Sequence, residues 1–183
     1  GAMRDPGKVN AIAAYQKHPE QSVRLAAAIS LGKIPHKVAM LRLMDSLEDE
    51  EATVRGAAVL QLAGVANGDI AFDLLTDAAA SRDVPERRRL YALEALARYF
   101  DTVMADNKLK AESRRTKQQK QAFKLGKRLL NDSAGEGWNI RGHAVKLVAS
   151  CDHPDAKKFL EKYEQQEKHP FVLGKIKQAL VAE

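Results

Sequence analysis

Hydrophobic residues recur three and four residues apart in a series of short segments along this chain. This spacing gathers apolar side chains on one stripe of a helix, so it predicts amphipathic helices. Aromatic residues make up only 5% of the chain, and the apolar positions are filled mainly by Ala, Leu, Val and Ile. Such a composition suits closely packed helix pairs better than a β-sandwich. We therefore expect an all-α fold.

One phrase recurs in this pattern, with an apolar residue and an arginine followed by further apolar positions and a closing leucine or valine. The first two copies are Val23-Arg24-Leu25-Ala26-Ala27 and Val54-Arg55-Gly56-Ala57-Ala58, and three more begin at Arg88, Ile140 and Val172. The second positions are spaced 31 (24 to 55), 34 (55 to 89), 52 (89 to 141) and 32 (141 to 173) residues apart. The chain thus contains five repeats, and the 52-residue interval holds an insertion.

Another amphipathic segment precedes each copy, so each repeat is predicted to be a helix A, a turn and a helix B. The expected A helices are Lys8 to Lys17, Lys37 to Leu47, Ile70 to Ala80, Gln118 to Leu130 and Asp155 to Gln165. Pro19, Pro85 and Pro170 stand in the turns, where a new helix begins. Gly32 and Gly64 follow the first two B helices, which predicts left-handed C-caps.

The phrase V-R-x-A-A-x-x-x-L-G resembles the second helix of the short HEAT repeats of phycobilisome lyases, from about Lys8 to Ala182. This resemblance implies a right-handed α-solenoid, or α-α superhelix, of about five helix pairs over residues 8–183. Residues 1–7 would form an N-terminal arm, and their first three resemble the remnant of a protease site. In such stacks the repeat arginine commonly faces acidic groups of neighbouring turns. We therefore expect a structural ladder of four arginines, namely Arg24, Arg55, Arg89 and Arg141.

No set of residues for catalysis or cofactor binding stands out. The sequence has no His-Glu-x-x-His, no paired cysteines and no glycine-rich phosphate loop. The single Cys151 is interpreted as a buried structural residue, the alternative being a nucleophile served by His153. We expect no metal, no cofactor and no enzymatic activity. Trp138 is interpreted as a hydrophobic staple before the fourth B helix, the alternative being an exposed anchor for a ligand.

The third and seventh positions of the phrase normally face solvent and are polar, but here they are apolar in the first repeats. Leu25, Ile29, Leu60 and Leu90 are therefore predicted to form an apolar strip on the concave surface of the B helices. Such a strip marks an interface or is covered by another part of the chain or by a second copy. The main hypothesis is a non-enzymatic protein-interaction scaffold that binds a partner helix or peptide there.

A basic segment supports an alternative function. Residues 101–130 carry nine Lys or Arg and three Asp or Glu, and this excess of six equals the net charge of the whole chain, +6. A nucleic-acid-binding module could use the insertion at about 101–120 and the residues after it, whereas an ordinary solvated helix face explains the same charges. The basic surface proposed on this alternative consists of Lys108, Lys110, Arg114, Arg115, Lys117, Lys120 and Lys124.

Three further expectations concern the surroundings of the chain. No run of about 18 uncharged apolar residues occurs, so we expect no membrane span. One cysteine cannot form an intrachain disulfide, which fits a reducing cytoplasm, the predicted location. The final helix is apolar along its stripe up to Val181. Either the B helix of the fourth repeat covers this stripe, or a larger protein or complex does.

Overall fold

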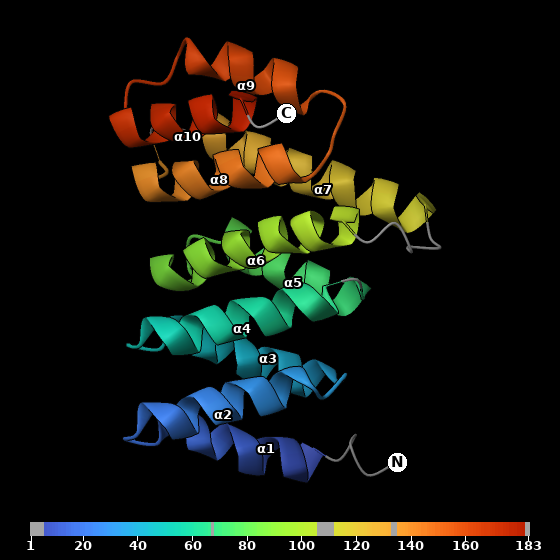
Figure 1. The fold of residues 1–183 in the computed structure, drawn as a ribbon, viewed down its shortest axis with the longest axis vertical. Helices are drawn as coiled ribbons and strands as arrows, with labels where there is room; N and C mark the ends of the chain where they lie inside the picture. Colours follow the sequence, from blue (N-terminus) through green and yellow to red (C-terminus); the bar gives the residue numbers. More distant parts are fainter. Residues whose placement is uncertain (1–5, 67, 106–111, 133–134, 182–183) are drawn as a thin grey trace. The chain divides into compact units, whose positions relative to one another are not determined.

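The structure is a computed structural model that describes residues 6–66, 68–105, 112–132 and 135–181. Within these ranges the side chains of residues 6, 103–105 and 112–115 are not described. In the described ranges it contains ten α-helices, two short 3-10 helices and no strand (Figure 1). The predicted all-α class is confirmed.

The α-helices form five consecutive pairs, each with a helix A followed by a helix B. The A helices are α1 (Pro6–Ala14), α3 (Lys37–Asp45), α5 (Asp69–Ala80), α7 (Glu112–Asn131) and α9 (Ala156–Glu164). The B helices are α2 (Gln21–Gly32), α4 (Ala52–Val65), α6 (Glu86–Ala105), α8 (Trp138–Ser150) and α10 (Pro170–Val181). The 3-10 helices η2 (Tyr15–Lys17) and η3 (Ser46–Glu48) follow α1 and α3. The predicted α-solenoid of helix pairs is confirmed.

The chain forms two compact units, residues 1–95 and residues 96–183, and the border between them lies within α6. In the first unit the B helices α2 and α4 pack side by side, and α1, α3 and α5 form a second layer behind them (Figure 1). In the second unit α8 packs against both α7 and α10. In each unit, neighbouring B helices therefore pack side by side, α2 with α4 and α8 with α10.

Small side chains allow α2 and α4 to approach closely. The contact buries alanines together with Leu31 and Leu62, and the alanines also favour helix formation. A Cβ on Gly32 would collide with the Cβ of Gln61, so glycine is needed there for helix packing. The predicted left-handed C-caps are wrong, because no described glycine has a positive φ and Gly64 lies inside α4.

The long interval between the third and fourth repeats lengthens the helices on either side of it. α6 and α7 each have 20 residues, whereas α2 has 12 and α4 has 14. All of the predicted insertion at 101–120 that the structure describes, residues 101–105 and 112–120, is therefore helical. Gly126 brings α7 against α8, because a Cβ at this position would come within 2.5 Å of Cγ2 of Val148.

Candidate functional site

The first repeat arginine, Arg24, lies in the first turn of α2 and is only 6% exposed. Nε of Arg24 donates to Oδ2 of Asp49 (2.8 Å), and Nη2 donates to Oδ1 of Asp49 (3.1 Å) and to Oε1 of Glu50 (3.0 Å). Nη1 donates to the carbonyls of His18 and Pro19, both at 3.0 Å. Arg24 therefore ties the turn before its own helix to the turn of the next repeat.

Two arginines contact Asp49, Arg24 at its carboxylate and Arg55 at its backbone carbonyl. Burial alone would raise the pKa of the Asp49 carboxyl, but the hydrogen bonds from Arg24 and from the backbone N–H of Glu51 lower it below its ordinary value. The carbonyls of Asp49 and Glu50 accept from Nη1 of Arg55 at 2.6 and 2.7 Å. The Arg55 guanidinium also lies over the ring of Tyr91, 5.2 Å from its centroid. One turn is thus shared by two successive repeats.

The same arrangement recurs in the second unit around Glu167. Nε and Nη2 of Arg141 donate to the two carboxylate oxygens of Glu167 at 2.9 and 3.1 Å, and Nη1 donates to the Glu136 carbonyl at 2.7 Å. The Tyr163 hydroxyl donates to the same carboxylate at 2.8 Å. The backbone N–H groups of residues 168 and 169 complete the set at 2.9 and 2.8 Å.

These contacts decide the charge state of the Glu167 carboxyl. Burial alone would raise its pKa, but the hydrogen bonds from Arg141, from two backbone N–H groups and from Tyr163 outweigh burial and lower the pKa to about 2.

Arg89 is also buried, and its Nε donates to the Ala79 carbonyl at 3.2 Å. The contacts of Arg24 and Arg141 with acidic side chains of the next repeat agree with the predicted structural ladder. Arg55 and Arg89 donate to backbone carbonyls.

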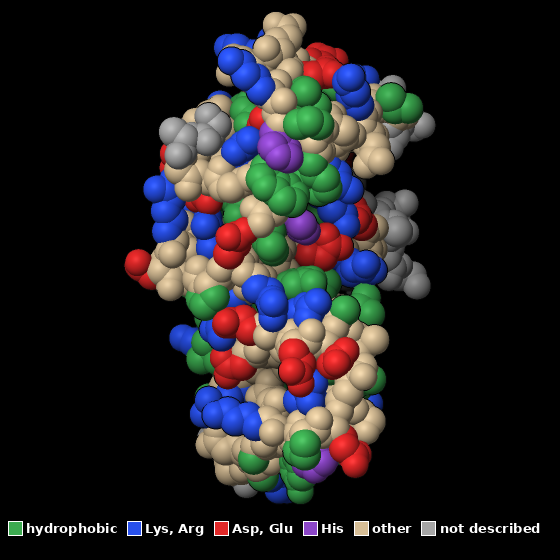
Figure 2. Space-filling view, turned by 90° about the vertical axis from the view of Figure 1, so that its left-hand side faces the viewer, with side chains coloured by type: hydrophobic (Ala, Val, Ile, Leu, Met, Phe, Trp, Pro, Cys, Tyr) green, Lys and Arg blue, Asp and Glu red, His purple; other side chains and the backbone are tan. Residues whose placement is uncertain are grey.

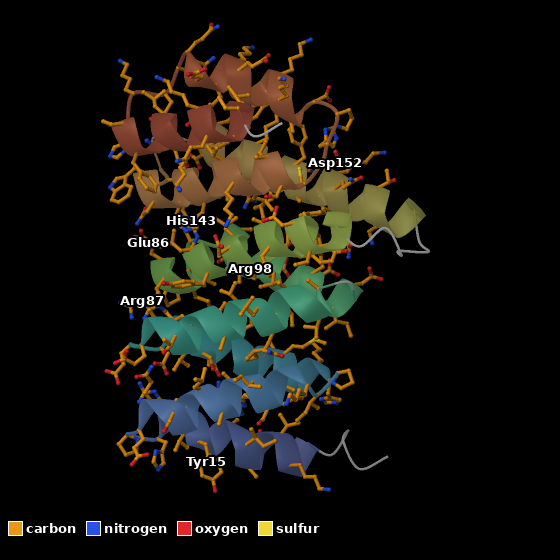
Figure 3. The ribbon with its side chains drawn as sticks, viewed as in Figure 1. Tyr15, Glu86, Arg87, Arg98, His143 and Asp152 are labelled. Atoms are coloured by element: carbon orange, nitrogen blue, oxygen red, sulfur yellow. The ribbon has the colours of Figure 1, made fainter. Side chains whose placement is uncertain are left out.

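Cys151, His153 and His143 are each engaged in packing or in a backbone contact. The Cys151 thiol is fully buried and donates to the Val148 carbonyl at 3.2 Å, and burial raises its pKa to about 11. The His153 ring stacks on Phe123 with centroids 4.1 Å apart. His143, labelled on α8 in Figure 3, is bonded through Nδ1 to the Asn139 carbonyl oxygen at 2.9 Å. Among the described residues, no group of three His, Cys, Asp or Glu could hold a metal ion.

The four residues of the predicted apolar strip lie on B helices. Leu25 and Ile29 lie on α2, Leu60 on α4 and Leu90 on α6. Leu60 is 53% exposed, whereas the other three are half-buried. A strip of uniform exposure is therefore not formed, and Leu60 is its most accessible point. Partner binding by these residues stays a prediction.

The surface around Leu60 on α4 carries no charged side chain, and glycines flank Leu60 on both sides. Gly56 and Gly64 lie one turn before and one turn after Leu60, and a Cβ on either glycine would meet no atom within 4 Å. α2 and α4 each contain a single charged residue, Arg24 and Arg55, and both arginines are engaged with the turns. The outward face of α2 and α4 therefore consists of apolar, small and uncharged polar residues.

The predicted basic surface is described only in part. Lys108 and Lys110 lie outside the described residues, and the side chains of Arg114 and Arg115 are likewise not described. The remaining three are exposed along one stripe of α7, namely Lys117, Lys120 and Lys124. This stripe lies opposite the buried face of α7, which includes Ala122, Leu125 and Leu129. The arrangement is that of a solvated amphipathic helix.

Two further surface features were not found from the sequence. On the A-helix layer of the first unit, a groove of about 600 Å³ lies between α3 and α5, with Leu41, Leu74 and Val84 among its lining residues. An ion pair of 3.0 Å between Arg88 and Asp45 stands at this groove. Arg87, labelled at the start of α6 in Figure 3, donates to the Glu48 carbonyl at 3.4 Å.

The second feature is an aromatic cluster on α8 and α10. Trp138 is 47% exposed and stacks on His169, with ring centroids 5.1 Å apart and an interplanar angle of 1°. It also meets Phe171 edge to face at 5.1 Å. Trp138 is the first residue of α8 and packs across onto the next repeat, so the staple interpretation is wrong.

Comparison with known proteins finds a family match for part of the chain and a similar fold for the whole of it. The sequence matches the family of HEAT repeats over residues 10–97. No curated protein matches it. Among solved structures, a chain of the complex of CpcE and CpcF of phycocyanin lyase from Nostoc sp. PCC7120 is similar, with a TM-score of 0.62 and 22% identity. The alignment covers 96% of this chain and 99% of that chain.

A second solved structure, human deoxyhypusine hydroxylase in complex with glycerol, has a TM-score of 0.33 and 14% identity, covering 96% of this chain and 84% of that one. The family match, the five helix pairs and the Nostoc structure agree with one another. Residues 10–97 thus match the HEAT repeats, and the chain as a whole shares the fold of the Nostoc structure. None of the helices that the structure describes is long and apolar enough to cross a membrane.

Proposed function

We propose that this protein is an interaction scaffold that binds a partner helix or peptide on the B-helix face of its first unit. The observation that carries the proposal is the uncharged outward face of α2 and α4, with Leu60 53% exposed at its centre. Charged residues make up 30% of the chain, so a two-helix surface without an accessible charge is unusual for it. Exposed apolar surface of this kind marks interaction sites.

The shape of this face fits a packed partner helix or an extended peptide. Leu60 projects between Gly56 and Gly64, where the lack of side chains leaves room for a partner backbone to come close to α4. Leu25 and Ile29 on α2 and Leu90 on α6 would widen the apolar contact. The similar Nostoc chain comes from a complex of two proteins, CpcE and CpcF, which supports a protein partner. No step of this function requires a cofactor.

Replacing Leu60 with aspartate tests the proposal. The full chain is immobilised and exposed to a lysate of its source organism, and Leu41→Asp on α3 serves as the matched control. Leu41 is 44% exposed but belongs to the A-helix layer. We expect the wild type and Leu41→Asp to capture the same protein and Leu60→Asp to lose it. Because Leu60 is a surface residue, the free energy of unfolding should change by no more than about 0.5 kcal/mol.

Two outcomes would contradict this assignment. Capture by Leu60→Asp at the wild-type level would exclude the B-helix face, and loss of capture by Leu41→Asp alone would move the site to the groove between α3 and α5. A melting temperature measured for each variant separates loss of binding from loss of folding.

The same experiment distinguishes the alternative function, nucleic-acid binding by the basic 101–130 segment. It rests on the exposed stripe of Lys117, Lys120 and Lys124 along α7. Contacts with phosphates weaken steeply as salt is raised, whereas an apolar contact does not. Capture that survives both nuclease and a rise from about 50 to about 500 mM salt is the result expected from the apolar face. Capture that disappears under either treatment supports the basic segment.

A further inference from the structure

We infer that the groove between α3 and α5 is a second docking site, which takes a basic amphipathic helix of another protein. The helix would bury its apolar stripe in the groove and place Lys or Arg side chains beside Asp73 and Asp77 of α5. The groove lies on the A-helix layer of the first unit and uses none of the residues of the B-helix face. It therefore stands or falls independently of Leu60.

The groove exists because the two A helices leave space between them. Alanines and Gly32 bring α2 and α4 together, whereas α3 and α5, in the layer behind, border an opening of about 600 Å³ (Figure 1). Met44 of α3 and Ala78 of α5 line it and are both buried. Val84, from the turn after α5, lines it as well. A ligand in this groove would thus contact a largely apolar surface.

Exposed apolar side chains extend this surface on both helices. Leu41 of α3 lines the groove and is 44% exposed. Leu74 of α5 also lines it, and Ile70, one turn earlier on the same side of α5, is 50% exposed. Apolar side chains gathered in this way on the surface of a protein mark an interaction site.

The charge of the α5 wall identifies the kind of partner. α5 contains aspartates and no Lys or Arg. Asp73 and Asp77 are exposed one turn apart, and Asp77 lines the groove. Within the described part of the chain, neither of these two carboxylates forms an ion pair. Asp69 already has a partner in the chain, so Asp73 and Asp77 supply the negative charge of this wall.

Two arginines also line the groove, but neither makes it basic. Arg88 pairs with both Asp45 and Glu48, which leaves this cluster with one negative charge in excess. Nη2 of Arg42 lies 3.5 Å from Oδ1 of Asn10 on α1, and α3 stands between α1 and α5 (Figure 1). The side on which the B helices begin carries a mixture of acidic and basic side chains instead (lower part of Figure 2). The groove therefore favours a cationic ligand.

The dimensions of the groove fit a helix. Its lining on α3 runs from Val38 to Asp45, seven residues (45 minus 38) or about 10 Å, which is about two helical turns. A helix bound in such a groove contacts it through apolar residues at positions i, i+3 or i+4, and i+7. Asp73 and Asp77 are four residues apart, which matches two Lys or Arg four residues apart beside that stripe. The negative charge disfavours a nucleic acid.

Fluorescence anisotropy with a designed peptide tests the inference. The probe is a labelled alanine-based helix of about 18 residues, with Leu at i, i+4 and i+7 and two Lys four residues apart beside the leucines. We expect a saturable rise in anisotropy when the full chain is added. A peptide with Glu in place of both Lys should bind about tenfold more weakly, because it meets Asp73 and Asp77 with like charge. A central proline, which breaks the helix, should weaken binding at least about tenfold.

Two neutral substitutions of exposed leucines separate the two surfaces of the first unit. Leu41→Gln should weaken binding of the Lys peptide by about tenfold, because it removes an apolar contact. Leu60→Gln should change it less than about twofold, since Leu60 lies on the B-helix face. Circular dichroism confirms that both variants fold. Either surface can therefore fail its test without the other.

Removal of the two acidic side chains tests the charge. The double variant Asp73→Asn, Asp77→Asn should bind the Lys peptide about fivefold more weakly, the effect of losing two exposed ion pairs. Glu20→Gln is the matched control, because Glu20 is exposed in the turn before α2 and its side chain makes no capping hydrogen bond. It should change binding less than about twofold.

Several results would overturn the inference. One is the absence of a saturable rise in anisotropy with the Lys peptide. Another is equal binding of the Lys and Glu peptides, or of the double Asn variant and the wild type, which would contradict a cationic ligand. Equal weakening by Leu41→Gln and Leu60→Gln would place the peptide outside the groove. Undiminished binding of the proline peptide would contradict a helical ligand.

Discussion

Replacing Arg24 with alanine is expected to lower the free energy of unfolding by about 3–5 kcal/mol, the cost of removing one partner of a buried ion pair. The side chains of Arg24 and Asp49 are 7% and 8% exposed. Without Arg24, the Asp49 carboxylate loses two hydrogen bonds, and the carbonyls of His18 and Pro19 lose their donor. Buried groups left without partners account for most of the loss.

Urea denaturation followed by far-ultraviolet circular dichroism measures this loss. Arg42→Ala is the matched control, because Arg42 is exposed and its guanidinium makes only a long hydrogen bond of 3.5 Å to Asn10. The control should change the free energy of unfolding by about 0.5 kcal/mol or less. A loss below about 1 kcal/mol for Arg24→Ala would show that the arginine ladder does not hold the turns together.

Glu167→Ala is expected to have an effect of similar size in the second unit, about 3–5 kcal/mol at neutral pH. Its carboxylate accepts two hydrogen bonds from Arg141, one from Tyr163 and two from backbone N–H groups, and its side chain is 4% exposed. Removing it leaves a half-buried guanidinium without a counter-charge. Glu161→Ala on the exposed side of α9 is the matched control and should be close to neutral.

The effect of Glu167→Ala should depend on pH in one direction. The pKa of Glu167 is about 2 in the folded chain and about 4.5 in its ordinary state. The folded state therefore binds this carboxylate's proton less readily, and the stability that Glu167 contributes is fully present above pH 4.5. It is lost as the pH falls from 4.5 towards 2. The difference in stability between the wild type and Glu167→Ala should shrink over that range, and Trp138 emission can report it.

A difference that stays constant from pH 7 to pH 2 would contradict the ion pair as the source of this stability. A difference that grows on acidification would reverse the proposed sign. Glu167→Gln adds a further comparison, because it removes the charge but keeps an acceptor oxygen. It should lie between the wild type and Glu167→Ala at neutral pH.

The repeat phrase predicted the fold well because its signals are local and recur. The four arginines in register predicted the positions of the B helices, and the prolines in the turns predicted where new helices begin. The partner of Arg141 was missed, although a signal for it exists. Asp49 and Glu50 stand 25 and 26 residues after Arg24, and Glu167 stands 26 residues after Arg141. Residues 80 and 81, at the same distances from Arg55, are Ala and Ser, and Arg55 lies over Tyr91 instead.

Exposure was harder to predict than helix position. The periodic pattern placed Leu25, Ile29, Leu60 and Leu90 on the outward side of their helices, but the degree of burial depends on how close neighbouring helices come. Alanine contacts and Gly32 bring α2 and α4 together, and only Leu60 is left more than half exposed. The cluster of Trp138, His169 and Phe171 depends in the same way on the register of α8 against α10, which no local pattern encodes.

Site-specific photo-crosslinking from position 60 tests the binding face most directly. A photoreactive residue replaces Leu60 in one preparation and Leu41 in another, and each is irradiated in the presence of the captured partner. We expect a crosslinked product from position 60 and none from position 41, because the partner should cover α4 and leave α3 open. A product from position 41 alone, or none from position 60 while the partner is still captured, would contradict binding on the B-helix face.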